Sequence, residues 1–333
     1  MSCLLRNAVA VAALAAALCA SPPASAQPNP FRTVDGWLEA PAGRVLGSVS
    51  GVAMDARGNV WIAERCGAND CSTNDTVDPI LRADSSGRVR ASFGAGMFAF
   101  PHGIYVDPSG DVWVTDARAG NGRGHRVIKF DAEGRVLLAL GTAGVAGNGP
   151  DHFNGPTGVA VAPNGDVFVT DGHETDSNNR VVKFTSAGKF VKEWGRSGSG
   201  PGEFLVPHAI ALDSRGRVFV ADRDNNRVQI FDQDGKFLDQ WTQFGRPSGL
   251  VVTGDDTLIV SDNQSNTARH PGWKRGIRIG SARDGLVRAF IPDPDFDPSR
   301  DQETGAHGMA ADAAGHIYGA EVWSQTVKKY EPR

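Results

Sequence analysis

The chain has 333 residues, with 38 acidic against 34 basic side chains and a net charge of −4. This mild acidity argues against nucleic acid or an anionic membrane surface as a partner, because basic patches recognise both. The 41 glycines and 19 prolines are typical of many short strands joined by tight turns.

The first 26 residues have the pattern of a secretory signal peptide. Arg6 supplies the positive start, residues 8–20 form a short apolar run, and residues 24–26 form a small-residue cleavage site. The run is too short for a spanning helix, and no other segment predicts membrane insertion. We therefore expect a secreted or periplasmic protein whose mature chain, residues 27–333, folds as a single domain.

Two cysteines remain in the mature chain, Cys66 and Cys71, and both lie in one loop. Because an exported protein meets an oxidising compartment, we expect a disulfide between them. The alternative is a metal-binding pair, but no neighbouring residue completes a ligand set.

Six copies of one pattern fill the mature chain. Each has a short first strand, a turn that usually contains glycine, and an apolar second strand that ends in an acid. The turn and second strand recur at residues 56–64, 108–116, 163–171, 214–222, 254–262 and 313–321. Third and fourth strands follow, as at 180–184 and 190–194. Four antiparallel strands per copy predict an all-β, six-bladed β-propeller.

The sixth copy has no fourth strand of its own, whereas residues 32–39 precede the first copy and are predicted to form a lone strand. We expect this N-terminal strand to complete the sixth blade. Such a closure removes the exposed sheet edges of the ring.

One position upstream of each turn alternates between a hydroxyl residue and histidine. Its occupants, in chain order, are Ser50, His102, Thr157, His208, Ser248 and His307. In a ring of six blades, alternate copies lie about 120° apart, so three imidazoles converge on the axis. Three histidines with an open fourth position favour a catalytic zinc site. The alternative is that each histidine fills the channel and hydrogen-bonds to the backbone.

The acid that ends each second strand recurs in all six copies, which favours a structural role in turns. Arg65, Arg223 and His173 follow such acids without recurring, and the strand directions predict that they surround the same mouth as the histidines. Arginine suits a substrate carboxylate, and His173 suits a general base or acid. The alternatives are arginines paired with neighbouring acids and a polar loop histidine. The loop 263–275, with His270 and Trp273, either covers the mouth or lies on the surface.

Several of these segments resemble peptidyl-α-hydroxyglycine α-amidating lyases, and the repeats are similar to NHL repeats. The similar segments are residues 45–55 with Arg65, 100–103, 152–157, 204–208 and 221–229. The resemblance covers nearly all of the mature chain and is strongest from 44 to 231. It implies zinc held by His102, His208 and His307, and an enzyme that cleaves the N–Cα bond of a peptidyl-α-hydroxyglycine to give an amide and glyoxylate. Arg65 and Arg223 fall on the active-site arginines of the family.

The chain departs from the family at two positions. The family's active-site tyrosine falls on His173, so the exact substrate stays open. The structural calcium of the family would use the backbone of Val52 and Ile104 and an aspartate, but Gly308 occupies the aspartate position. Without that charged ligand, calcium stays open as well.

Our interpretation is a zinc-dependent carbon–nitrogen lyase with Arg65, His173 and Arg223 as catalytic residues. We expect a monomer that acts on a small molecule or peptide carrying a carboxylate. A lactonase-like metal-dependent hydrolase is one alternative, and a non-catalytic propeller that binds a peptide or glycan is another.

Overall fold

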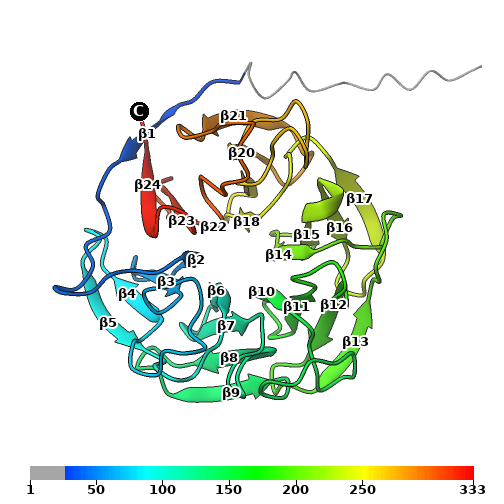
Figure 1. Cartoon of the computed structure of the whole chain (residues 1–333). Coiled ribbons are helices and arrows are strands. Elements are labelled where there is room, and N and C mark those ends of the chain that lie inside the picture. The colour runs from blue at the N-terminus through cyan, green and yellow to red at the C-terminus, as the bar shows by residue number, and fades with distance from the viewer. Residues whose placement is uncertain (1–26) are drawn as a thin grey trace, which may run out of the picture.

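Six antiparallel sheets of four strands surround a central axis (Figure 1). The computed structural model describes residues 27–333, so the predicted signal peptide at 1–26 lies outside the described residues. The predicted six-bladed β-propeller is confirmed.

The first three blades are continuous in sequence. Blade one contains β2 (Val49–Met54), β3 (Val60–Glu64), β4 (Ile80–Ala83) and β5 (Val89–Phe93); blade two contains β6 (Pro101–Val106), β7 (Val112–Asp116), β8 (Arg126–Phe130) and β9 (Val136–Leu140); blade three contains β10 (Pro156–Val161), β11 (Val167–Asp171), β12 (Arg180–Phe184) and β13 (Phe190–Trp194).

The last three blades include one short 3-10 helix, η2, and the strand from the N-terminal segment. Blade four contains β14 (Pro207–Leu212), β15 (Val218–Asp222), η2 (Arg223–Asn225), β16 (Arg227–Phe231) and β17 (Phe237–Trp241); blade five contains β18 (Gly249–Val252), β19 (Thr257–Asp262), β20 (Gly276–Ser281) and β21 (Val287–Pro292); blade six contains β22 (Gly308–Ala311), β23 (Ile317–Glu321), β24 (Thr326–Pro332) and β1 (Phe31–Val34).

The ring is closed by β1, which pairs with β24 so that Phe31 lies opposite Pro332 and Val34 opposite Lys329. Figure 1 shows the blue N-terminal segment beside the red C-terminal strand. The predicted closure is confirmed, but the strand is shorter than the expected 32–39. It ends because a turn follows, in which Gly36 adopts a φ of +64° that favours glycine.

The hydrophobic core consists of six clusters, each between neighbouring blades. Trp61 of blade one, for example, packs with Val112 and Phe130 of blade two. At the closing joint, Trp37 contacts the Tyr318 ring at 5.0 Å between centroids. The second strands β7, β11 and β15 are buried along their whole length because a neighbouring blade covers each face. This double covering explains their continuous apolar sequence.

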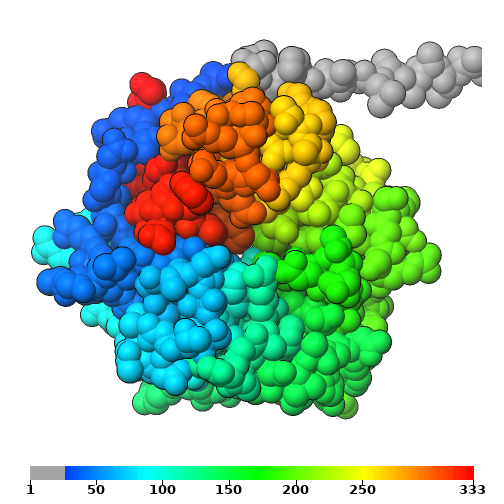
Figure 2. Space-filling view, in the orientation of Figure 1, coloured from blue at the N-terminus to red at the C-terminus, as the bar shows by residue number. Residues whose placement is uncertain are grey.

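The inner strands β2, β6, β10, β14, β18 and β22 lie nearest the axis (Figure 1). With all atoms drawn, the blades close around a small central opening (Figure 2). Each ring position identified in the sequence lies at or just before the start of an inner strand, so the fold brings all six to one end of the channel. Within residues 27–333, no helix is long and apolar enough to cross a membrane.

Candidate metal centre

The three histidines meet on the axis, as the repeat predicts. Their ring centroids form a nearly equilateral triangle with sides of 4.6, 4.8 and 5.0 Å. All three side chains are buried, and each offers a nitrogen within 4.8 Å of the others. The described part of the chain has no other group of three histidine, cysteine or acidic ligands this close together.

Each histidine is held by a backbone carbonyl of the next blade. The Nδ1 atom of His102 lies 2.9 Å from the Thr157 oxygen, that of His208 lies 2.7 Å from the Ser248 oxygen, and that of His307 lies 2.7 Å from the Ser50 oxygen. A carbonyl only accepts hydrogen bonds, so each Nδ1 carries the proton. The three Nε2 atoms therefore keep their lone pairs, as ligated histidines do.

The donor set fits a zinc ion. The Nε2 atoms of His102 and His208 are 3.2 Å apart. Two nitrogens at the usual Zn–N distance of about 2.0–2.1 Å, in tetrahedral geometry, would be about 3.3 Å apart. Two facing lone pairs repel each other unless a cation or a proton lies between them. Metal ligation therefore explains this spacing better than the alternative of three histidines that only fill the channel.

Burial also keeps these imidazoles in the neutral form that binds metals. Desolvation lowers the pKa of His102 and of His208 well below the usual value, and it lowers the pKa of His307 to about 3. Neighbouring positive groups, including Arg65 and Arg223, act in the same direction.

Two of the three hydroxyl residues between the histidines also connect neighbouring blades. Ser50 donates to the Pro101 carbonyl at 2.9 Å, and Thr157 donates to the Pro207 carbonyl at 2.6 Å. Each of these prolines directly precedes a histidine. Ser50 and Thr157 thus fix the backbone of the residues that precede His102 and His208.

Glycine follows five of the six ring residues, a signal that our sequence reasoning missed. These residues are Gly51, Gly103, Gly158, Gly249 and Gly308. A Cβ atom at Gly103 would lie 2.4 Å from the Thr157 oxygen, which also accepts the bond from His102. Adjacent inner strands thus approach too closely for a side chain, and this approach brings each carbonyl within reach of a histidine.

The same crowding occurs at Gly308, the position where the resemblance implies a calcium-binding aspartate. A Cβ atom at Gly308 would lie 2.8 Å from the Ser50 oxygen and 2.9 Å from the Gly51 Cα atom. An aspartate at this position would require the inner strands to move apart. Because the backbone has no room for the charged ligand that the resemblance implies, the residues present do not fit the family's calcium site.

A polar cavity of about 880 Å³ opens above the ring, and the predicted residues Arg65, His173 and Arg223 line it together with His307. The structure therefore brings together the residues that the strand directions assigned to one mouth. The lining contains six arginines and four carboxylates, an excess of two positive charges: Arg65, Arg118, Arg223, Arg246, Arg269 and Arg300 against Glu174, Asp224, Asp301 and Glu303. Such a cavity favours an anionic ligand.

Arg65 is buried and forms no ion pair with the described residues. Its side chain donates to the Pro101 carbonyl and to the Asn69 side chain, and its guanidinium stacks on the Phe100 ring at 3.6 Å. Desolvation, reinforced by the charge of Arg118, lowers the pKa of Arg65 to about 9. The alternative of an arginine paired with a neighbouring acid therefore does not apply to Arg65.

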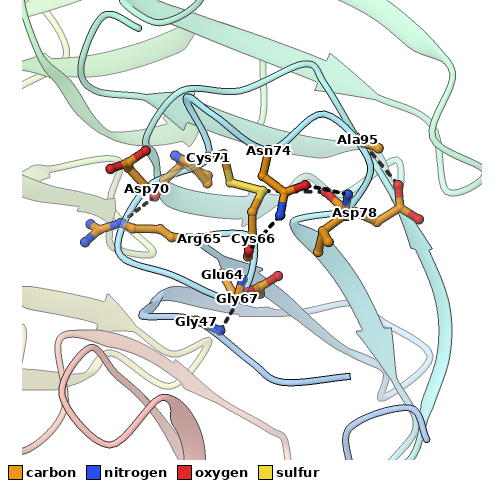
Figure 3. Close-up of a disulfide and its surroundings, with 12 residues drawn as sticks. Gly47, Glu64, Arg65, Cys66, Gly67, Asp70, Cys71, Asn74, Asp78 and Ala95 are labelled. Atoms are coloured by element: carbon orange, nitrogen blue, oxygen red, sulfur yellow. Dashed lines mark hydrogen bonds between the residues drawn. A yellow bond between two sulfur atoms is a disulfide. The ribbon is translucent and has the colours of Figure 1, made fainter. Parts of the chain in front are cut away.

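The predicted disulfide between Cys66 and Cys71 closes the loop that begins at Arg65 (Figure 3). Cys66 adopts a φ of +52°, and the Asn74 side chain donates to its carbonyl. The alternative of a metal-binding cysteine pair is wrong. The covalent link and the turn fix the chain on both sides of Asn69, which contacts Arg65.

Arg223 begins η2 on the opposite side of the mouth. Its Nε atom lies 3.4 Å from Asp224, and Asp224 also forms an ion pair with Arg246. Arg246 in turn donates to the Arg223 carbonyl at 3.2 Å. Arg223 is thus paired with a neighbouring acid, Asp224, which it shares with Arg246. Burial nevertheless lowers the pKa of Arg223.

His173 is buried beside the histidine triangle. Its ring packs edge to face against His102 and Phe100, at 4.8 and 5.5 Å between centroids, and its Nδ1 atom lies 2.8 Å from Glu174. Desolvation lowers the pKa of His173 to about 4, so the ring is neutral at neutral pH. This environment is not that of an exposed polar loop residue.

The acids that end the second strands have the structural role that their recurrence predicts. Five of them accept backbone N–H groups: Glu64, Asp116, Asp171, Asp222 and Asp262. The sixth, Glu321, pairs with Lys328 instead.

Residues that do not recur in the repeat were harder to recognise. Sequence reasoning missed Arg118, Glu174 and Arg246, which all line the cavity. The adjacency of Glu174 to His173 was visible in the sequence, but no pattern brings Arg246 to this mouth. From the blade-five loop, Gln264 and Arg269 line the cavity, whereas His270 stacks on Trp273 at 4.7 Å.

Comparisons with known proteins agree with the motifs. The NHL repeat model matches residues 98–130, 153–184 and 204–231. The chain is 38% identical over 202 residues to peptidylglycine alpha-amidating monooxygenase of Rattus norvegicus, covering 54% of this chain and 20% of that protein. It is 37% identical over 199 residues to a probable peptidyl-alpha-hydroxyglycine alpha-amidating lyase of Caenorhabditis elegans, covering 54% of each. The match thus spans about a fifth to a half of these relatives.

Among solved structures, a gluconolactonase of Xanthomonas campestris superposes with a TM-score of 0.60 and 16% identity, covering 95% of this chain and 99% of that one. At this identity the likeness concerns the fold alone. The repeats and the curated relatives confirm the predicted resemblance: the chain contains NHL repeats and is similar to peptidyl-α-hydroxyglycine α-amidating lyases.

Proposed function

We propose that this protein is a zinc-dependent lyase that cleaves the N–Cα bond of an α-hydroxyglycine-type substrate to give an amide and glyoxylate. The observation that carries the proposal is the triangle of His102, His208 and His307, whose Nε2 lone pairs converge below an arginine-rich cavity. The relatives named as amidating lyases support the same reaction.

Arg65 is our candidate for binding the substrate carboxylate. It is a buried guanidinium without an ion pair among the described residues, and it lines the cavity. A planar guanidinium holds a carboxylate through two parallel hydrogen bonds. Arg223 lines the cavity as well, and we propose that it contacts the same substrate end while Asp224 balances part of its charge.

His102, His208 and His307 would hold the zinc ion. When bound, zinc supplies a Lewis acid that makes a neighbouring hydroxyl group more acidic. The carbonyls of Thr157, Ser248 and Ser50 fix the three rings, so the site needs little rearrangement.

The chain's own residues move the proton. We propose that His173, a neutral imidazole beside the triangle, accepts the proton of the substrate hydroxyl. The C–O bond then becomes the carbonyl of glyoxylate, and the electrons of the N–Cα bond pass to the amide nitrogen. That nitrogen takes up one proton, so the products are a carboxamide and glyoxylate with no water consumed.

Export belongs to the same proposal. The signal-peptide pattern of residues 1–26 supports a secreted or periplasmic protein. The disulfide between Cys66 and Cys71 is consistent with an oxidising compartment.

Incubation of the mature protein with an α-hydroxyhippurate-type substrate tests the proposal. We expect equal amounts of glyoxylate and amide, and about one equivalent of zinc per chain, since one three-histidine site binds one ion. No glyoxylate from a fully metal-loaded protein would overturn the lyase proposal. Hydrolysis of a lactone by the same sample would then favour the hydrolase alternative, and inactivity toward both would favour a binding propeller.

A further inference from the structure

The imidazole of His173 is attached to a carboxylate that the sequence pattern did not single out. Its Nδ1 atom lies 2.8 Å from Glu174 Oε1. The same oxygen accepts a bond from Arg118 Nε at 3.0 Å. Arg118, Glu174 and His173 thus form a continuous chain from the half-exposed rim to the buried ring beside His102.

This contact selects one tautomer of the imidazole. An ionised carboxylate only accepts hydrogen bonds, so the proton of the neutral ring must be on Nδ1. The bond from His173 lowers the pKa of Glu174 to about 2, which is consistent with an ionised carboxylate. The Nε2 atom of His173 then carries a lone pair, and it forms no hydrogen bond with any described residue.

The orientation of the ring is already fixed by other contacts. The backbone N–H of His173 donates to the Gly155 carbonyl at 3.0 Å, and the ring packs between Phe100 and His102. The special contribution of Glu174 is therefore the location of the proton. This assignment matters because the opposite tautomer would present an N–H group to the cavity instead of an acceptor.

We propose that Glu174 is a positioning residue that holds His173 in the Nδ1–H tautomer, so that Nε2 accepts a hydrogen bond from the substrate hydroxyl. The part of this inference that concerns the substrate rests on the proposed lyase function. The tautomer itself does not, because it follows from contacts within the chain. Arg118 supports the carboxylate from the rim, where a half-exposed ion pair contributes little by itself.

Histidine tautomers are measured directly by NMR of 15N-histidine-labelled protein, and a His173→Asn spectrum assigns the His173 signals. In the wild type we expect a protonated Nδ1 and an unprotonated Nε2 on His173. In Glu174→Ala, which removes the acceptor, we expect a shift toward the Nε2–H tautomer. Glu133→Gln is the matched control, because this exposed carboxylate lies between β8 and β9 and is not among the residues that line the cavity beside His173.

Kinetics provide the second readout. Carboxylates that orient a metal-bound histidine contribute about 10–100-fold, and by analogy kcat should fall by about this factor in Glu174→Ala while KM changes little. Zinc content should stay the same, because Glu174 does not contact His208 or His307. An unchanged tautomer or an unchanged kcat in Glu174→Ala overturns the proposal. A tautomer shift in a protein that releases no glyoxylate overturns only the lyase function.

Discussion

Two sets of residues face each other at the mouth of the channel, and they are built differently. The ring of His102, His208 and His307 comes from equivalent positions of alternate blades, and each member bonds to the backbone of the next blade. The rim of Arg65, His173 and Arg223 comes from the loops after the second strands, whose sequences differ between blades, and each member has its own support: a disulfide-closed loop, a carboxylate and a 3-10 turn.

This difference in construction corresponds to two proposed roles, metal binding by the ring and substrate binding with proton transfer by the rim. The ring inherits its geometry from the symmetry of the propeller, so any change to it disturbs the metal site and the packing of inner strands together. The rim residues are supported separately, so we expect that each can be changed without disturbing the other two. We therefore expect ring variants to lose metal, and rim variants to keep metal while they lose substrate binding or proton transfer.

The largest effect should come from the ring variant His208→Ala. Loss of one of three ligands should reduce zinc from about one equivalent to a small fraction. A metal that lowers a barrier by several kcal/mol is worth about 10²–10⁴-fold in kcat, and that is the expected loss. Elemental analysis and glyoxylate release measure the two quantities. His316→Ala, on the β22–β23 turn, should change neither.

A smaller loss, confined to the substrate, is expected for the rim variant Arg65→Ala. Charge-assisted hydrogen bonds contribute about 1.5–3 kcal/mol, so kcat/KM should fall by about 10–100-fold. Zinc content should stay the same. The loss should disappear for a substrate whose carboxylate is replaced by a neutral amide, and an equal loss on both substrates would contradict the assigned role. The exposed Arg57→Ala is the control.

The close approach of the inner strands at Gly103 is the next feature that separates ring from rim. In Gly103→Ala, the new Cβ atom would lie 2.4 Å from the carbonyl that holds His102. Overpacking of this kind costs about 1–3 kcal/mol of unfolding free energy, and disturbed outer-shell bonds weaken metal binding by about 10–100-fold. Thermal unfolding and competition with a chelator test both. Gly254→Ala, which meets no atom within 4 Å, should be neutral.

The smallest effect is expected from the double variant Cys66→Ser, Cys71→Ser. Closing so short a loop contributes about 2 kcal/mol in the chain-entropy model. The free energy of unfolding, measured with denaturant, should therefore fall by about that amount at most. Because the loop also carries Asn69 beside Arg65, KM should rise while zinc content does not change. A loss of zinc would mean that ring and rim are not independent.

The sequence was enough to predict the propeller, because six copies of one strand pattern leave few other architectures. It also predicted the meeting of His102, His208 and His307, since alternate copies in a closed ring face one another. The rim was predicted in outline: the strand directions brought Arg65, His173 and Arg223 to one mouth. The length of β1 was overestimated because the turn at Gly36 was not recognised.

What the sequence by itself determined about this protein is whatever repeats in it: the blades, the closure by β1, the ring positions and the capping acids. The tertiary structure alone decided which tautomer each histidine adopts, that Arg65 has no carboxylate partner among residues 27–333, and that Gly308 has no room for a side chain. The physical reason is that repeated positions follow from local strand geometry. Hydrogen-bond partners, burial and close approach depend on segments of different blades that only the closed ring brings together.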